Sequence, residues 1–174
     1  MTVRAAIVTV SDRAFAGEYE DKGGPGCEFW LRGVVTTPLT VTRHIIPDGR
    51  ASVAQMLRVL VAEKAGLILV TGGTGPAPRD ETPEGVADVI EKELAGFGEE
   101  MRRASLAEVP TAILSRQTAG IAGQSLIITL PGKPAAIATC LNAVFAAVPY
   151  CLDLIGAGRI ETDPAKITAF RPKA

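Results

Sequence analysis

The chain has 174 residues, enough for one ordinary domain and too few for two comfortable ones. Apolar residues make up 47% and charged residues 21%, which indicates a globular protein with a substantial core, and the 5% of aromatics makes that core aliphatic. Eighteen basic and nineteen acidic side chains nearly cancel. This balance argues against nucleic-acid and membrane partners, because proteins that bind either need a cationic face.

Cys27, Cys140 and Cys151 include no Cys-x-x-Cys pair, which argues against a disulfide framework or a zinc site. Buried free thiols in a reducing cytoplasm are the expected state. His44 is the only histidine, so a His-rich metal site within one chain is excluded. The N-terminus does not resemble a signal peptide, and we expect no apolar run that approaches the ~20 residues needed to span a bilayer.

The first half of the chain predicts two strand–helix units. Residues 4–10 are apolar and β-branched, typical of a strand buried on both faces. A polar, glycine-bearing loop is expected over 11–24, and a helix over 25–35. Residues 39–46 alternate and predict a second strand, and the spacing of apolar residues over 51–64 predicts an amphipathic helix.

The second half continues this alternation and adds a hairpin. Residues 66–70 predict a third buried strand, and residues 118–122 and 125–130 flank Gly123-Gln124, a pattern typical of a β-hairpin. The remaining helices are expected to open at Thr82 and to cover 97–108, 134–147 and a segment ending near 155. The residues from Arg159 onward predict a loosely packed tail.

Alternating strands and helices indicate a doubly wound α/β domain with a mostly parallel sheet and an antiparallel edge hairpin. We expect a single domain over residues 1–158 and a C-terminal tail over 159–174. Ligands of such sheets bind beyond the carboxyl ends of the strands. In this chain those ends carry small, polar or charged residues, namely Ser11-Asp12, Pro47-Asp48, Thr71–Gly75 and Pro131–Lys133.

The segment Thr71–Gly75 contains three glycines, which let the backbone approach a ligand and present N–H groups to an anion. A plain strand-to-helix turn is the alternative. It is not a P-loop, because no lysine follows Gly75, and Gly132-Lys133 is followed by proline instead of Ser or Thr. It is not a dinucleotide fingerprint either, because Pro78 stands where the third glycine belongs.

Asp48 and Asp80 each follow a strand end. Two carboxylates together with polyphosphate oxygens commonly hold Mg²⁺. The alternatives are a helix-capping role for Asp80 near Thr82 and a turn role for Asp48 in Pro-Asp-Gly. Their occurrence at corresponding strand ends favours the functional interpretation.

Three cations lie near these loops: Arg79, Arg116 and Lys133. A phosphorylated substrate needs such groups, although ordinary surface charge is the alternative. For Asp12, in the long first loop, a solvated loop residue is the plainer interpretation.

A series of motifs resembles the molybdopterin adenylyltransferases, the MogA/MoaB-type proteins that are also similar to the gephyrin G domain. In chain order the motifs are Val10–Arg13, Asp21–Gly23, Ile46–Asp48, Thr71–Pro76, Arg79–Pro83, Ser115-Arg116 and Leu130–Pro134. The resemblance covers nearly the whole chain. It implies a three-layer α/β/α fold, a homotrimer, and the reaction of molybdopterin with Mg-ATP to give adenylylated molybdopterin and pyrophosphate.

By resemblance, Asp48 and Asp80 are the catalytic aspartates and the Mg²⁺ ligands. The expected substrate- and nucleotide-binding residues are Ser11, Asp12, Thr71, Gly72, Gly73, Thr74, Gly75, Arg79, Ser115, Arg116, Pro131, Gly132 and Lys133. A hand-over of product to a molybdate insertase is also implied. Two alternatives remain: a non-catalytic pterin-binding or scaffolding module, and the corresponding domain of an insertase, which would need further domains.

Overall fold

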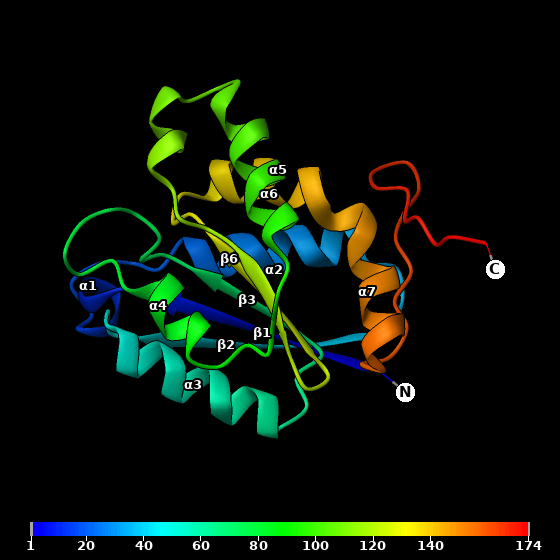
Figure 1. The fold of residues 1–174 in the computed structure, drawn as a ribbon, viewed down its shortest axis with the longest axis horizontal. Helices are drawn as coiled ribbons and strands as arrows, with labels where there is room; N and C mark the ends of the chain where they lie inside the picture. Colours follow the sequence, from blue (N-terminus) through cyan, green and yellow to red (C-terminus); the bar gives the residue numbers. More distant parts are fainter. Residues whose placement is uncertain (1, 174) are drawn as a thin grey trace.

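The protein forms one six-stranded sheet with helices on both faces (Figure 1). The computed structural model describes residues 2–173; residues 1 and 174, at the limits of the expected domain and tail, lie outside the described part. The strands are β1 (Val3–Val10), β2 (Leu39–Ile46), β3 (Leu67–Thr71), β4 (Lys92–Glu93), β5 (Ala119–Ala122) and β6 (Ser125–Leu130). The helices are α1 (Asp12–Phe15), α2 (Gly23–Val34), α3 (Arg50–Ala62), α4 (Thr82–Ala87), α5 (Ala95–Leu106), α6 (Pro134–Val144) and α7 (Val148–Ile155), with 3₁₀ turns η1 (Pro110–Leu114) and η2 (Phe145–Ala147).

The strand order is β2-β1-β3-β6-β5-β4. β1 pairs in parallel with β2 and β3, and β3 pairs in parallel with β6. The register places Thr71 beside both Thr9 and Leu130, so these strands end at one edge of the sheet. The strand order reverses between β1 and β3, which is where doubly wound sheets bind ligands.

The predicted hairpin is confirmed, and its two strands have different surroundings. β6 is the fourth parallel strand and lies inside the sheet, between β3 and β5. All six of its residues are buried, and all are apolar or small. β5 and the two-residue strand β4 form the antiparallel edge. β4 was not predicted, since two charged residues carry no strand pattern.

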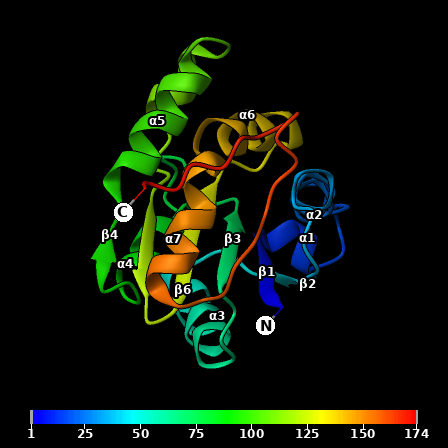
Figure 2. The ribbon, with the colours of Figure 1, turned by 90° about the vertical axis from the view of Figure 1, so that its right-hand side faces the viewer.

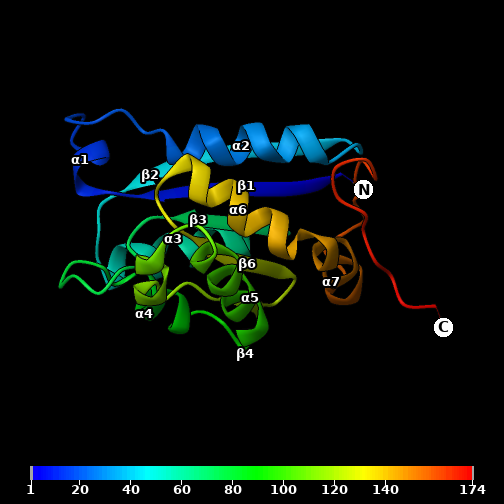
Figure 3. The ribbon, with the colours of Figure 1, turned by 90° about the horizontal axis from the view of Figure 1, so that it is seen from above.

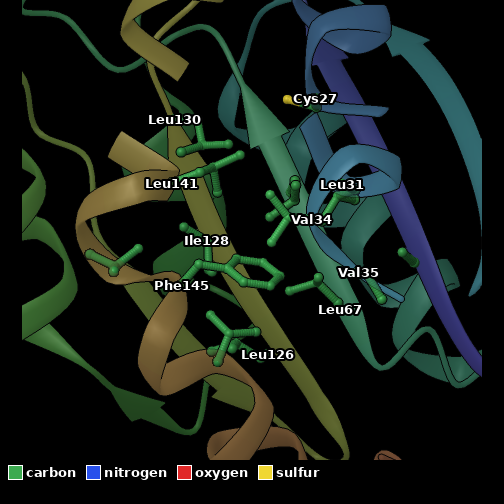
Figure 4. Close-up of a cluster of buried hydrophobic side chains, with 14 of the residues drawn as sticks. Cys27, Leu31, Val34, Val35, Leu67, Leu126, Ile128, Leu130, Leu141 and Phe145 are labelled. Atoms are coloured by element: carbon green, nitrogen blue, oxygen red, sulfur yellow. The ribbon is translucent and has the colours of Figure 1, made fainter. Parts of the chain in front are cut away.

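The helices form two layers, so the three-layer α/β/α fold is confirmed. α3 and α4 cover one face, where Val53, Leu57 and Val86 pack on the even-numbered side chains of β1 and β3. The other face is covered by α2, α5, α6 and α7, as the edge-on and upper views show (Figures 2 and 3). In that layer Phe145 lies against Ile128 and Leu126 (Figure 4).

The segment Pro134–Ile155 corrects the expectation about apolar runs. Helical structure continues over its 22 residues, and its most apolar 18-residue window has a mean hydropathy of 1.8, so it is long and apolar enough by these two measures to cross a membrane. The stretch is divided into α6, η2 and α7, and 44% of its most apolar window is buried inside the domain. Its apolar character therefore has a structural cause, because it supplies much of one face of the core.

The expectation of a loosely packed tail is wrong for the segment around Ile160 and for Arg171, which are held against the domain. Ile160 is fully buried, and Thr36 N–H donates to the carbonyl of Glu161. Arg171 donates to the carbonyl of Ile160 and pairs with Asp153 of α7. The tail therefore crosses the amino ends of the strands, opposite the edge at which the predicted site residues lie (Figure 2).

Candidate active site

Two adjoining cavities open at the carboxyl ends of the parallel strands. The larger has a volume of about 510 Å³ and includes the glycine segment, η1 and the start of α6 in its walls. The smaller, of about 150 Å³, is lined by Val10, Ser11, Asp12, Arg13, Asp48, Gly73, Arg79 and Asp80. Gly73 and Asp80 line both cavities, so the two adjoin along these residues.

The glycine segment leaves β3 in a conformation that L side chains rarely adopt. Gly72 has φ +98° and Gly73 has φ +66°. A Cβ on Gly72 would collide with the carbonyl of Val10, and one on Gly73 with the hydroxyl of Thr82. Among the described residues, the N–H groups of Gly73, Thr74 and Gly75 donate to no protein acceptor, so they can bind an anion.

Neighbouring loops hold this segment from behind. The Thr82 hydroxyl donates to the Gly72 carbonyl at 2.8 Å, and the Thr82 N–H donates to the Gly73 carbonyl at 3.1 Å. The Thr71 hydroxyl donates to the Pro131 carbonyl at 2.7 Å and joins the ends of β3 and β6. α4 begins at Thr82 as predicted, and the same residue anchors the glycine segment.

Asp12 and Asp48 bind each other's backbone. The Asp12 N–H donates to Asp48 Oδ2 and the Asp48 N–H donates to Asp12 Oδ1, both at 3.0 Å. Because Asp12 follows β1 and Asp48 follows β2, this reciprocal pair fixes the two strand ends together. Asp12 is therefore not a merely solvated loop residue. Ser11 caps α1 by accepting from Ala14 N–H, which corrects the expectation of a plain loop there.

Asp80 closes the far end of the glycine segment. Its Oδ2 accepts from the Ala77 N–H at 3.0 Å, while its side chain lines both cavities. It does not cap α4, for which Glu81 holds the N-cap position without a side-chain hydrogen bond. The competing capping role of Asp80 is therefore excluded.

Arg116 lies behind the segment and lines neither cavity. Its guanidinium donates to the carbonyls of Gly75 and Asp80 and pairs with Glu84 of α4. Its backbone N–H donates to the Thr74 carbonyl at 2.8 Å. The hydrogen bond from Arg116 lowers the pKa of Glu84. Arg116 thus ties both ends of the segment to α4, a positioning role that the prediction of substrate binding did not include.

The remaining predicted cations face the cavities. Lys133 lines the larger one at the N-cap position of α6, and Arg79 lines the smaller one. α6 begins with Pro134, and Ala136 of its first turn also lines the larger cavity. A lysine at the N-terminus of an 11-residue helix favours a negatively charged group there.

One wall of the larger cavity was largely unforeseen. The end of α5, η1 and the segment between η1 and β5 supply Ser105, Glu108, Val109, Thr111, Ala112, Leu114, Ser115 and Gln117, and of these only Ser115 was predicted. The single usable signal was the Val109-Pro110 break after the α5 pattern. No local motif shows that this segment folds over β6.

The carboxylates that line the smaller cavity can coordinate a divalent cation only if a bound substrate supplies further oxygen donors. Within residues 2–173, no three His, Cys, Asp or Glu side chains gather closely enough to form a metal site by themselves. Asp48 and Asp80 each use one oxygen for a backbone N–H and keep the other free of protein donors. Mg²⁺ retains waters and binds substrate phosphates, so two such oxygens beside an anion nest fit it.

A doubly wound α/β domain with an anion nest and paired carboxylates at its switch point belongs to the class of proteins that bind phosphorylated ligands. The family model described as "Probable molybdopterin binding domain" matches residues 6–150. The chain belongs to this family of molybdopterin-binding domains.

Relatives extend over almost the full length. The chain is similar to the molybdopterin adenylyltransferase of Escherichia coli (strain K12), 46% identical over 186 residues that cover 99% of this chain and 95% of the relative. The enzyme of the same name from Helicobacter pylori (strain J99) is 47% identical, with 99% and 98% covered. Among solved structures, the molybdopterin biosynthesis enzyme MoaB from Thermus thermophilus has a TM-score of 0.82 at 37% identity, with 91% and 99% covered.

Proposed function

We propose that this chain is a molybdopterin adenylyltransferase that transfers the adenylyl group of ATP to molybdopterin. Relatives of that name are 45–47% identical over nearly the full chain. The observation that carries the proposal is the pair of adjoining cavities, both lined by Gly73 and Asp80. A ring-sized cavity beside a small, charged one suits two substrates that meet through their phosphates.

In the proposed reaction, an oxygen of the terminal phosphate of molybdopterin attacks the α-phosphorus of ATP. A new P–O bond forms, the bond to the β-phosphate bridging oxygen breaks, and pyrophosphate leaves with that electron pair. Nucleotidyl transfer asks the protein chiefly for positioning and charge stabilisation. The free N–H groups of Gly73 to Gly75 hold a phosphate, and Lys133 and Arg79 balance its charge from either side.

Asp48 and Asp80 are the proposed ligands of Mg²⁺, each through the oxygen that no backbone N–H occupies. When bound, the ion supplies charge stabilisation for the leaving pyrophosphate. Asp12 keeps the Asp48 carboxylate in place, and Ala77 does the same for Asp80.

Incubation with molybdopterin and Mg-ATP, followed by detection of pyrophosphate and adenylylated pterin, tests this function. Equal amounts of both products are expected. A scaffolding module would bind the pterin and leave ATP intact. That result would contradict the enzymatic function and support the scaffolding one. Omitting Mg²⁺, or chelating it, separates the metal requirement from substrate binding.

The proposal extends to a cytoplasmic homotrimer that hands its product to a molybdate insertase. The resemblance supports the trimer and the hand-over, and large exposed apolar side chains such as Phe29, 83% exposed, offer contact surface. Light scattering after gel filtration should give three times the chain mass. A monomer that is fully active would contradict the trimer.

A further inference from the structure

A hydrogen-bonded chain of polar side chains runs from the larger cavity into the core. The Ser115 hydroxyl donates to Gln117 Oε1 at 3.0 Å, and Gln117 Nε2 donates to Cys140 Sγ at 3.4 Å. Cys140 Sγ is in turn 3.5 Å from the hydroxyl of Ser105. Ser105, Ser115 and Gln117 all line the cavity, while Gln117 is only 2% exposed and Cys140 is fully buried.

The direction of these hydrogen bonds decides what Ser115 can offer to a ligand. A serine hydroxyl has one proton and two lone pairs. Since its proton is directed to Gln117 Oε1, only lone pairs are left for the cavity. A ligand group that meets Ser115 must therefore carry the proton itself, as a ring or amino N–H does.

The orientation of the Gln117 side-chain amide sets the direction of the hydrogen bond with Ser115, since rotating the amide by half a turn exchanges its oxygen and its nitrogen. In the observed orientation Nε2 is directed at the sulfur of Cys140, which leaves Oε1 for Ser115. The opposite orientation would turn an N–H toward Ser115, and the hydroxyl proton would then face the ligand. The backbone of Gln117 is held separately, since its carbonyl accepts from Arg102 Nη1 at 2.7 Å.

We propose that Gln117, anchored by Cys140, is a positioning residue that makes Ser115 a hydrogen-bond acceptor, so that the larger cavity selects a heterocycle edge bearing an N–H group. This inference rests on the proposed adenylylation and specifies how that site recognises a substrate. Two substrates carry the required chemistry: the amino and ring N–H edge of the pterin, and the amino group of adenine. Burial of an N–H group that loses its acceptor costs about 1–3 kcal/mol, or roughly 5- to 150-fold in affinity.

Three single substitutions test the inference in the full-length chain: Ser115→Ala, Cys140→Ala and Cys140→Ser. The dissociation constants of molybdopterin and of ATP are measured separately by calorimetry, and KM and kcat by pyrophosphate release. Ser115→Ala should raise the dissociation constant of one of the two substrates by about 5- to 100-fold. Cys140→Ala should raise the dissociation constant and KM of the same substrate by about 3- to 10-fold with kcat nearly unchanged, because the lost contact is made equally in ground and transition states.

Cys140→Ser is the matched control, since its hydroxyl still accepts from Gln117 Nε2. It should bind both substrates within about twofold of the parent chain. Equal losses in Cys140→Ser and Cys140→Ala would overturn the inference, because they would show a packing effect without a role for the acceptor. Values within twofold for both substrates in Ser115→Ala would overturn it as well.

The two sources of the N–H group are separated by purine riboside triphosphate, which carries a hydrogen atom where ATP carries an amino group and has no ring N–H. If Ser115 accepts from adenine, the parent chain discriminates between the two nucleotides and Ser115→Ala does not. If it accepts from the pterin, only molybdopterin binding changes. If the proposed function is wrong, the parent chain releases no pyrophosphate. The binding constants test separately, and without turnover, whether Ser115 accepts a hydrogen bond from the ligand.

Discussion

A Gly72→Ala substitution would place a side-chain carbon where the backbone leaves no room for one. Its Cβ would lie closer than 3.0 Å to the carbonyl oxygen of Val10, and ordinary contact requires at least 3.4 Å, so one of the two loops must move by more than 0.4 Å. Gly72 also has φ +98°, which adds strain for any L side chain. Strain of about 1–2 kcal/mol and overpacking of about 1–3 kcal/mol together lower the free energy of unfolding by about 3 kcal/mol.

For a chain of this length, about 3 kcal/mol corresponds to a loss of about 6–12 °C in the unfolding midpoint. Turnover should fall about tenfold or more, because the displaced segment carries the anion nest. Gly123→Ala is the matched control: Gly123 has φ +55°, with its nearest neighbour 3.9 Å from a Cβ, and lies in the β5–β6 turn. It should lose about 1–2 kcal/mol and keep its activity. Equal midpoints and equal turnover in the two variants would refute the reasoning.

Further predictions concern the carboxylates and the thiols. Asp80→Asn should fold normally and lose roughly 100-fold or more in turnover, because an amide is a poor Mg²⁺ ligand; near-normal turnover at saturating Mg²⁺ and ATP would contradict the assignment. Arg116 lowers the pKa of Glu84, so the stabilisation from this pair is present above the ordinary pKa of a glutamate and lost as pH falls through the lower folded value. Glu84→Gln should therefore lower the unfolding midpoint at pH 7 by about 2–4 °C at most, since the pair is partly exposed. The difference from the parent chain should disappear once the pH has fallen below the lowered pKa of Glu84, and a difference that persists in strong acid would contradict the ion pair. Burial raises the pKa of Cys27 to about 12, so a thiol reagent at pH 8 should label half-buried Cys151 first and Cys27 only after denaturation, as peptide mapping can show; early labelling of Cys27 would contradict its burial.

The strands and the position of the site follow from local patterns. Residues 125–130 are uncharged and mostly apolar because β6 is buried on both faces, and the glycines at 72 and 73 mark a backbone that only glycine adopts comfortably. Such features depend on conformational preferences and burial, which neighbouring residues encode. The edge of the sheet that gathers the polar strand ends was predictable for the same reason, since parallel strands share one direction.

Partnerships between distant side chains depended on the tertiary structure. The sequence shows Asp12 and Asp48 36 positions apart, and only the parallel register of β1 and β2 makes them bind each other's backbone. Likewise the sequence shows that Arg116 is a cation, but only folding brings its guanidinium to the carbonyl of Gly75 and the carboxylate of Glu84, where it holds the glycine segment in place.

The sequence alone thus determined the family, the α/β fold and the edge at which ligands bind, because these follow from composition, periodicity and motif order. The tertiary structure decided the wall made by α5 and η1, the contacts that hold the tail at Ile160 and Arg171, and the hydrogen bond that directs the Ser115 proton to Gln117. Each of these depends on which surfaces meet once the core has formed. A residue's chemical type is written in the chain, whereas its partners and the direction of its hydrogen bonds exist only in the folded molecule.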